Sequence, residues 1–119
     1  MNAVVVWIDH EHAKLYSFSA ERMSREILRA TYVDHHTHLR DRAERGLPGL
    51  FREVADRVRG AQGILIVGPG TARSEFLHYL QADEKPLAAR VVACEPVDHP
   101  SDAEIATFAA RYFQRPLAS

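Results

Sequence analysis

Two short runs of apolar residues constrain the fold of this 119-residue chain more than any other feature of its sequence. The first run is Ala3–Ile8, which is rich in β-branched and aromatic residues, and the second is Ile64–Val67. A strand with one face in water alternates apolar and polar residues, whereas an uninterrupted apolar run indicates a strand that is covered on both faces. The sequence therefore predicts a sheet whose central strands lie between helices.

The other elements follow from residue patterns and from the residues that begin and end helices. Ala13–Ser19 alternates and is separated from the first strand by a short polar segment, which predicts an antiparallel hairpin. Pro48 suits the first turn of a helix, Thr71 is expected to cap the next helix, and Ser101 with Glu104 has the spacing of a capping box. The predicted elements are strands at 3–8, 13–19, 25–33, 64–67 and 87–94, and helices at 48–59, 71–81 and from 101 to the helix-ending Pro116.

The order of these elements is β-β-β-α-β-α-β-α. It predicts an α/β domain of the ribonuclease-H-like fold, with a mixed five-stranded sheet and helices packed on its faces. Right-handed crossovers place the last two strands beside the first. We expect residues 1–119 to form a single domain with a flexible loop at about 34–47, because periodicity disappears there.

Composition excludes several classes of protein. With 15 basic and 16 acidic residues, the chain is neither a generally basic nucleic-acid binder nor an acidic tail protein. One cysteine, Cys94, forms no intramolecular disulfide and is expected in the core. No apolar stretch approaches the ~18 residues of a membrane span, and no signal peptide precedes the first strand. We expect a cytoplasmic protein without a cofactor.

The most specific local motif is the turn Gly68-Pro69-Gly70, followed by Thr71 and, in the first turn of the next helix, Arg73. Free amide groups at a helix N-terminus attract anions, and a cationic side chain would add directed charge. Gly68, Gly70, Thr71 and Arg73 are therefore candidate phosphate-binding residues. The alternative is a tight turn that needs glycine conformations, with Arg73 in solvent.

Residues Val67–Phe76 resemble the "GPG-x-x-K-x-x-F" segment of the central domain of archaeal and eukaryotic class-1 peptide-chain release factors and of Pelota. Segments 7–10, 95–100 and 109–113 are similar to short bacterial relatives labelled translational machinery proteins. The resemblance implies a ribonuclease-H-like domain that associates with the ribosome or with structured RNA, in translation or ribosome rescue. It also implies the central domain alone, without decoding and partner-binding domains.

The sequence departs from this family at two places. Release factors carry Gly-Gly-Gln in the loop after the third strand, but the corresponding segment here, Asp34–Gly46, contains no glutamine. We therefore expect a non-catalytic protein, because the glutamine that assists hydrolysis of peptidyl-tRNA is missing. The cation of the motif is Arg73 instead of lysine, which keeps the charge and changes its geometry.

The same loop has a second candidate role in binding. Its histidines and arginines form a cationic edge that can reach RNA phosphates, although Asp34, Asp41 and Glu44 offset much of the charge and favour a simply solvated loop. The candidates are His35, His36, His38, Arg40, Arg42 and Arg45. The histidines, with His10 and His12, also resemble a metal-binding tract, but no recognisable ligand spacing completes it and no native metal is expected.

Two alternatives to RNA binding remain open from the sequence. Ribonuclease-H-type nucleases bind metal through carboxylates, and Asp9, Glu95 and Asp98 lie at predicted strand ends, with Asp34 or Asp102 as a further ligand. The alternative without metal binding is that Asp9 is a turn residue that hydrogen-bonds to the backbone and that Glu95 is a polar residue at the end of a strand. A protein-interaction module without an RNA role is the other alternative.

Overall fold

The computed structural model describes residues 2–19, 22–31 and 46–118, so the candidates His35, His36, His38, Arg40, Arg42 and Arg45 lie outside the described residues. The elements in chain order are β1 (Ala3–Ile8), β2 (His12–Phe18), β3 (Met23–Arg29), α1 (Gly46–Arg57), β4 (Gly63–Gly68), α2 (Ala72–Asp83), α3 (Lys85–Ala88), β5 (Val91–Pro96) and α4 (Asp102–Ala118). No helix in the described part of the chain is long and apolar enough to cross a membrane.

The strands form one mixed sheet in the order β3-β2-β1-β4-β5. Strands β1 and β2 are antiparallel, as are β2 and β3, whereas β4 runs parallel to β1 and β5 runs parallel to β4. The two uninterrupted apolar runs, β1 and β4, therefore lie side by side at the centre, and all their residues are buried. The predicted fold class and the five-stranded mixed sheet are confirmed.

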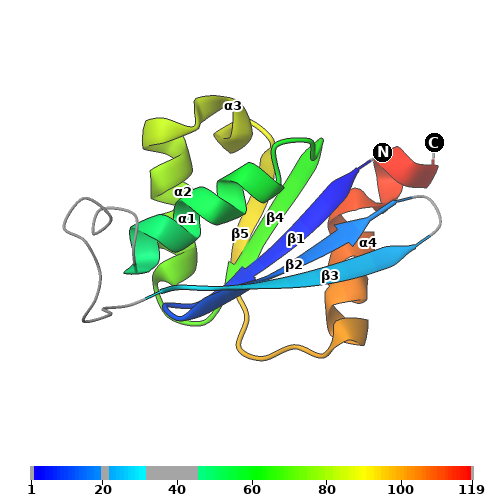
Figure 1. Cartoon of the computed structure of the whole chain (residues 1–119). Helices are drawn as coiled ribbons and strands as arrows, with labels where there is room; N and C mark the ends of the chain where they lie inside the picture. Colours follow the sequence, from blue (N-terminus) through cyan, green and yellow to red (C-terminus); the bar gives the residue numbers. More distant parts are fainter. Residues whose placement is uncertain (1, 20–21, 32–45, 119) are drawn as a thin grey trace.

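Alternate residues of the central strands enter two separate cores. Val4, Val6 and Ile8 face one side, where α1, α2 and α3 pack against the sheet (Figure 1). Val5 and Trp7 face the other side, where α4 contributes Ile105, Ala109 and Phe113. This arrangement explains why neither strand shows alternation, because each residue of β1 contacts a helical layer on one side or the other.

Several element bounds differ from the prediction. Strand β3 ends at Arg29, not near residue 33, and α1 begins at Gly46, whose left-handed φ of 64° allows its amide to donate to the Thr31 carbonyl at 2.8 Å. The predicted strand 87–94 begins only at Val91, because the short helix α3 precedes it with Pro86 in its first turn.

Both ends of α4 test a prediction about how helices begin and end. At its start the capping box is confirmed, since Ser101 Oγ accepts from the Glu104 amide at 3.1 Å and Glu104 Oε1 accepts from the Ser101 amide at 2.8 Å. The prediction that Pro116 ends the helix is wrong, as α4 continues to Ala118. Proline removes one amide donor, but its φ is compatible with a helical turn.

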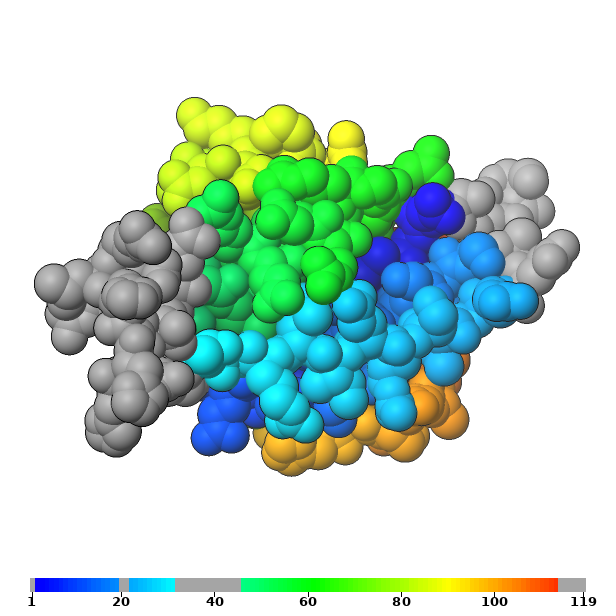
Figure 2. All heavy atoms as spheres, viewed as in Figure 1, coloured from blue at the N-terminus to red at the C-terminus, as the bar shows by residue number. Residues whose placement is uncertain are grey.

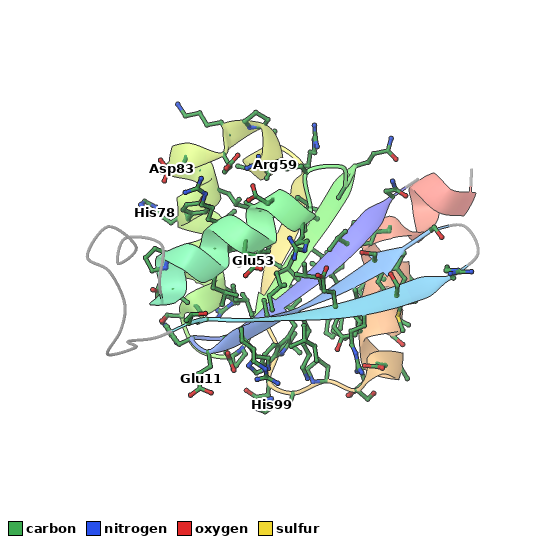
Figure 3. All side chains as sticks on the ribbon, viewed as in Figure 1. Glu11, Glu53, Arg59, His78, Asp83 and His99 are labelled. Atoms are coloured by element: carbon green, nitrogen blue, oxygen red, sulfur yellow. The ribbon has the colours of Figure 1, made fainter. Side chains whose placement is uncertain are left out.

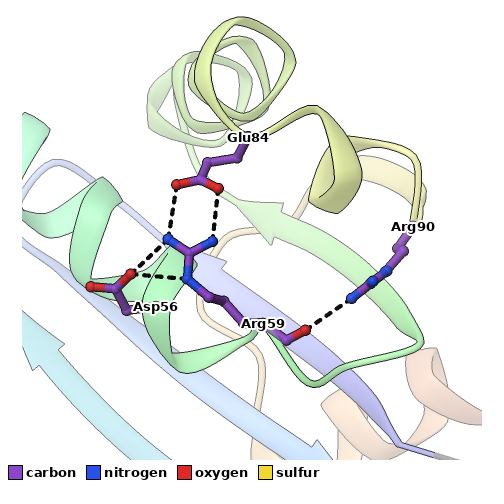
Figure 4. A network of polar contacts seen from close by, with 4 residues as sticks. All are labelled: Asp56, Arg59, Glu84 and Arg90. Carbon is purple, nitrogen blue, oxygen red and sulfur yellow. Dashed lines mark hydrogen bonds and ion pairs between the residues drawn. The ribbon is translucent and has the colours of Figure 1, made fainter.

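A charged network joins the residues that follow α1 to the junction of α2 and α3 (Figure 4). The guanidinium of Arg59 donates to both carboxylate oxygens of Glu84, at 2.8 and 2.9 Å, and to Asp56 Oδ1 at 2.7 Å. Arg90 donates to the Arg59 carbonyl at 2.9 Å. This paired geometry lowers the pKa of Glu84 below its usual value. The network fixes the helical layer around the connection that leads into β4.

Candidate functional site

The candidate anion site lies where the parallel strands β1 and β4 end and the chain turns into α2. Gly68 is required for close packing at this turn, since a Cβ there would overlap the carbonyl oxygen of Ile8 in the neighbouring strand. Gly70 has a φ of 59° in the left-handed region, and an added Cβ would meet no atom within 4 Å. The two glycines therefore have different roles. Gly68 allows the backbones of β1 and β4 to approach closely, and Gly70 adopts the left-handed conformation that the turn requires.

Thr71 does not cap α2, contrary to the prediction. Its side chain makes no capping hydrogen bond, and its hydroxyl instead donates to Glu75 Oε2 at 2.7 Å. The first amide groups of α2 consequently have no partner from Thr71, and both Gly70 and Thr71 are exposed. Amide groups at a helix N-terminus lie at the positive end of the helix dipole, where an anion is favoured, although Ala72, the first residue of α2, is itself buried.

A carboxylate that the sequence did not single out stands beside this helix end. Glu75 Oε2 lies 3.1 Å from His10 Nε2, and His10 Nε2 lies 3.5 Å from Thr71 Oγ1. The Thr71 hydrogen bond and His10 lower the pKa of Glu75. A signal for this group did exist, because residues that follow β1 and β4 must share one edge of a sheet in which these strands are parallel. The carboxylate opposes an incoming anion, and its two partners hold it to one side.

Arg73 is partly buried, and its guanidinium folds back to donate to the Gly70 carbonyl. Its Nε is buried and has no hydrogen-bond partner among the described residues. Its charge also acts on the Cys94 thiol, whose pKa is raised by burial and lowered in part by Arg73. Arg73 is therefore folded over the turn with part of its side chain exposed, and it holds a positive charge there.

Asp9 has a structural role at the end of β1. Its Oδ1 accepts hydrogen bonds from the backbone amides of Glu11 and His12, both at 2.8 Å, and it lies 3.3 Å from His12 Nδ1. The His12 ring also packs on the Trp7 indole, with 5.1 Å between centroids. Asp9 thus stabilises the β1–β2 turn, and His12 has different partners from His10. Glu11 lies at the lower side of the molecule in Figure 3, which also labels His99.

The other carboxylates of the nuclease alternative each have a separate setting. Glu95 Oε2 accepts from the Tyr112 hydroxyl at 2.5 Å, which ties β5 to α4. The backbone carbonyl of Asp98 accepts from Trp7 Nε1 at 2.7 Å. Asp102 pairs with an arginine of β3 at 3.3 Å.

Within the described residues, no group of three or more His, Cys, Asp and Glu side chains could hold a metal ion. Asp9, Glu95, Asp98 and Asp102 are therefore not brought together as the nuclease alternative requires, and Asp34 lies outside the described residues. Cys94 is half-buried against the larger core rather than fully enclosed as expected. The aromatic residues Trp7, Phe51, Phe76 and Phe113 are buried in the two cores, whereas Phe108 is only partly buried against the smaller one.

Comparisons with known proteins show which solved structures share this fold. No protein-family model matches the sequence, and no curated protein matches it. Among solved structures, Pelota from Archaeoglobus fulgidus superposes with a TM-score of 0.67 at 16% identity, over 98% of this chain and 32% of that chain. Pelota from Thermoplasma acidophilum gives a TM-score of 0.64 at 15% identity, over 94% of this chain and 34% of that chain.

An archaeal translation termination factor gives a TM-score of 0.60 at 15% identity, over 98% of this chain and 41% of that chain. The chain thus spans well under half the length of each of these proteins and has the fold of one part of them. The predicted similarity of fold to Pelota and release factors is confirmed.

Proposed function

We propose that this chain is a non-catalytic, cytoplasmic protein of the translation machinery that binds the ribosome or structured RNA through phosphate groups. The observation that carries the proposal is the exposed β4–α2 turn. There the uncapped amides of α2 and the charge of Arg73 meet, in a fold shared with a part of Pelota and of a translation termination factor. Gly68, Gly70, Thr71 and Arg73 are the proposed phosphate-binding residues.

The amide groups and Arg73 at the turn suit an anion with several oxygen acceptors, and the Glu75 carboxylate beside them acts against it. Backbone amides supply donors that carry no sequence information, so binding through them recognises the phosphate backbone and weakens as salt rises. The histidines and arginines between His35 and Arg45 are proposed as a second contact, because they gather positive or protonatable side chains in a short stretch of sequence. That set is His35, His36, His38, Arg40, Arg42 and Arg45.

A binding role is favoured over hydrolysis by two features of the chain. The segment Asp34–Gly46 contains no glutamine to assist the attack of water on an ester. Asp9 is engaged by backbone amides and Glu95 by a tyrosine hydroxyl, so each carboxylate stabilises a separate part of the fold. The first feature argues against hydrolysis of peptidyl-tRNA and the second against cleavage of RNA, so both support a binding role.

Gly70 offers a test that changes charge without removing a structural contact. Asparagine and aspartate both tolerate the left-handed conformation, and a Cβ at Gly70 meets no atom within 4 Å. Gly70→Asp places a negative charge at the turn, and Gly70→Asn is its neutral control of the same size. Co-sedimentation with ribosomes at low salt should be retained by Gly70→Asn and reduced about tenfold or more by Gly70→Asp, since charge repulsion acts at short range.

Arg73→Ala should also weaken co-sedimentation, while Arg111→Ala on the exposed side of α4 should leave it unchanged. Binding of the wild-type protein should fall steeply as salt increases. Failure to co-sediment at low salt would overturn the proposal, as would equal binding by the two Gly70 variants. Binding that is insensitive to salt would favour contact with a protein instead of RNA.

A further inference from the structure

A cavity of about 300 Å³ opens at the end of the sheet opposite the β4–α2 turn. It lies between the start of β1, the end of β2, the start of β3 and the connection from α1 to β4 (Figure 2). In Figure 2 the dark-blue start of β1 is recessed between the green and light-blue atoms of these segments. The cavity is lined by Asn2, Ala3, Val4, Ser17, Phe18, Ser19, Arg22, Ser24, Arg57, Gly60 and Ala61.

Several polar side chains of this cavity have hydrogen-bond donors that no other described residue accepts. Ser17 and Ser24 lie directly opposite each other in the β2–β3 register, so their hydroxyls occupy neighbouring positions on the face that α1 covers. Four of the lining side chains make no hydrogen bond or ion pair with the described residues, namely those of Asn2, Ser17, Arg22 and Ser24. Four side chains that can donate hydrogen bonds therefore line one hollow without internal partners.

The described residues of the lining carry charge of one sign. They include two arginines and no aspartate or glutamate, and Glu21, between Ser19 and Arg22, lies outside the described residues. Arg57 is already paired with Glu26 at 2.9 Å and with Glu53 at 3.7 Å, which leaves Arg22 as the cation available to a ligand. Hydroxyls that line one cavity together with a guanidinium that has no ion pair among the described residues suit an anion with several oxygen acceptors, above all a phosphate.

The remaining lining residues limit the volume of the ligand and favour an apolar surface on one side of it. Val4 is nearly buried, with 6% of its surface exposed, and Ala61 with 4%, so these residues offer an apolar floor beneath the polar rim. A volume of about 300 Å³ is at the lower end of small-molecule sites. A compact ring that carries hydroxyls and one phosphate matches both the floor and the rim.

We propose that this cavity binds the phosphate ester of a pentose, with the phosphate on Arg22 and the sugar hydroxyls on Ser17 and Ser24. The site is separate from the β4–α2 turn and does not depend on the proposed function. The same ribose phosphate chemistry occurs in a free sugar phosphate and in an RNA chain, and the experiment distinguishes these two sources.

The test follows backbone amide signals of the ¹⁵N-labelled protein during titration with ribose 5-phosphate. Signals of Ser17, Ser24, Gly60 and Ala61 should shift and saturate in the millimolar range or below. Arg22→Ala should weaken the affinity about tenfold or more, because it removes a charge-assisted hydrogen bond. Arg29→Ala, which removes the same charge from the far end of β3, should leave the titration unchanged.

Gly60 provides a second variant that blocks the cavity without removing a contact. A Cβ there meets no atom within 4 Å and its backbone is not left-handed, so Gly60→Phe should fold and abolish the shifts. Titration with unphosphorylated ribose and with inorganic phosphate separates the two parts of the ligand, and each alone should bind more weakly than the ester.

A short RNA that produces the same shifts at these residues identifies RNA as the source of the ribose phosphate. Shifts with the free ester alone identify a small molecule. The proposal is overturned if ribose 5-phosphate causes no saturable shift, if Arg29→Ala weakens binding as much as Arg22→Ala, or if inorganic phosphate alone binds as tightly as the ester. None of these results bears on ribosome binding through the β4–α2 turn, which the Gly70 variants test.

Discussion

The two faces of the sheet differ in what covers them, although the central strands are buried on both sides. One face carries α1, α2 and α3, whose side chains join those of four strands in the larger core. The other face carries α4 alone, and its core is smaller. A buried strand therefore does not reveal how many helices cover its face, because one helix is enough to bury β1 and β4 on this side.

The thinly covered face leaves the outer strands partly open. On that side of β3, Ile27 is 41% exposed and Met23 is 39% exposed, and Ile27 lies opposite Lys14 in the register. The Lys14 ammonium lies 5.3 Å from the centre of the Trp7 ring, so a cation covers apolar surface where no helix does. The three-helix face has instead an aromatic group of Phe51, Phe76 and Tyr79.

The largest expected difference concerns one buried phenylalanine on each face. Phe76→Ala removes a fully buried ring that contacts Phe51 and Tyr79 and should lower the free energy of unfolding by about 3–5 kcal/mol. Phe113→Ala removes an equally buried ring from α4, and its cost should fall near the lower end of that range, because the smaller core leaves more room to relax. Urea denaturation of both variants measures the difference, and equal costs would contradict the comparison.

The next effect concerns the turn where the chain passes from the central strand to the three-helix face. Gly68→Ala should destabilise the protein by roughly 1–3 kcal/mol, since the new methyl overlaps the Ile8 carbonyl and the two strands must separate. Gly60→Ala is the matched control. It has open space and should be neutral or stabilising by about 0.4–1 kcal/mol through the unfolded chain. A neutral Gly68→Ala would show that the strands are not held at this spacing.

The two faces should also weaken at opposite ends of the pH range, and acid should affect the three-helix face. Arg59 lowers the pKa of Glu84 below its usual 4.5, so the folded state favours the carboxylate. The stability from this pairing is present above about pH 4.5 and is lost as pH falls through the lowered pKa. Glu84→Gln should therefore reduce stability at neutral pH and approach the wild type in acid. Urea denaturation at neutral and at acid pH measures this difference, and a difference that persists in acid would contradict the assignment.

Alkali should produce the smallest effect, on the α4 face. The hydrogen bond to Glu95 raises the pKa of Tyr112 above its usual 10.0, so the folded state favours the protonated phenol. This contribution is present below about pH 10 and is lost as pH rises through the raised pKa. Tyr112→Phe should be slightly less stable than the wild type at neutral pH, with the difference shrinking in alkali. A difference that grows with pH in urea unfolding experiments would contradict this assignment.

The central strands, the hairpin, the helices and the capping box of α4 were predictable because each depends on residues that are close together in sequence. Helix α3 was missed because its four residues are too few for a helical period to be recognised in the sequence. At the candidate site, the glycine turn was predicted from its motif. The contact of Glu75 with His10 was not, because the pairing of β1 and β4 indicates which residues share an edge of the sheet but not which side chains there come within hydrogen-bond distance.

The sequence by itself determined the fold class, since uninterrupted apolar runs and the order of elements allow few arrangements of a sheet and its helices. Only the tertiary structure decided what individual polar side chains do. Arg73 folds over the turn, Asp9 holds a hairpin, and the hydroxyls of β2 and β3 line a cavity. The physical reason is the separation in sequence between the residues involved. Apolar patterning acts through burial along each element, whereas a polar side chain acts through a few directed contacts whose partners come from distant parts of the chain.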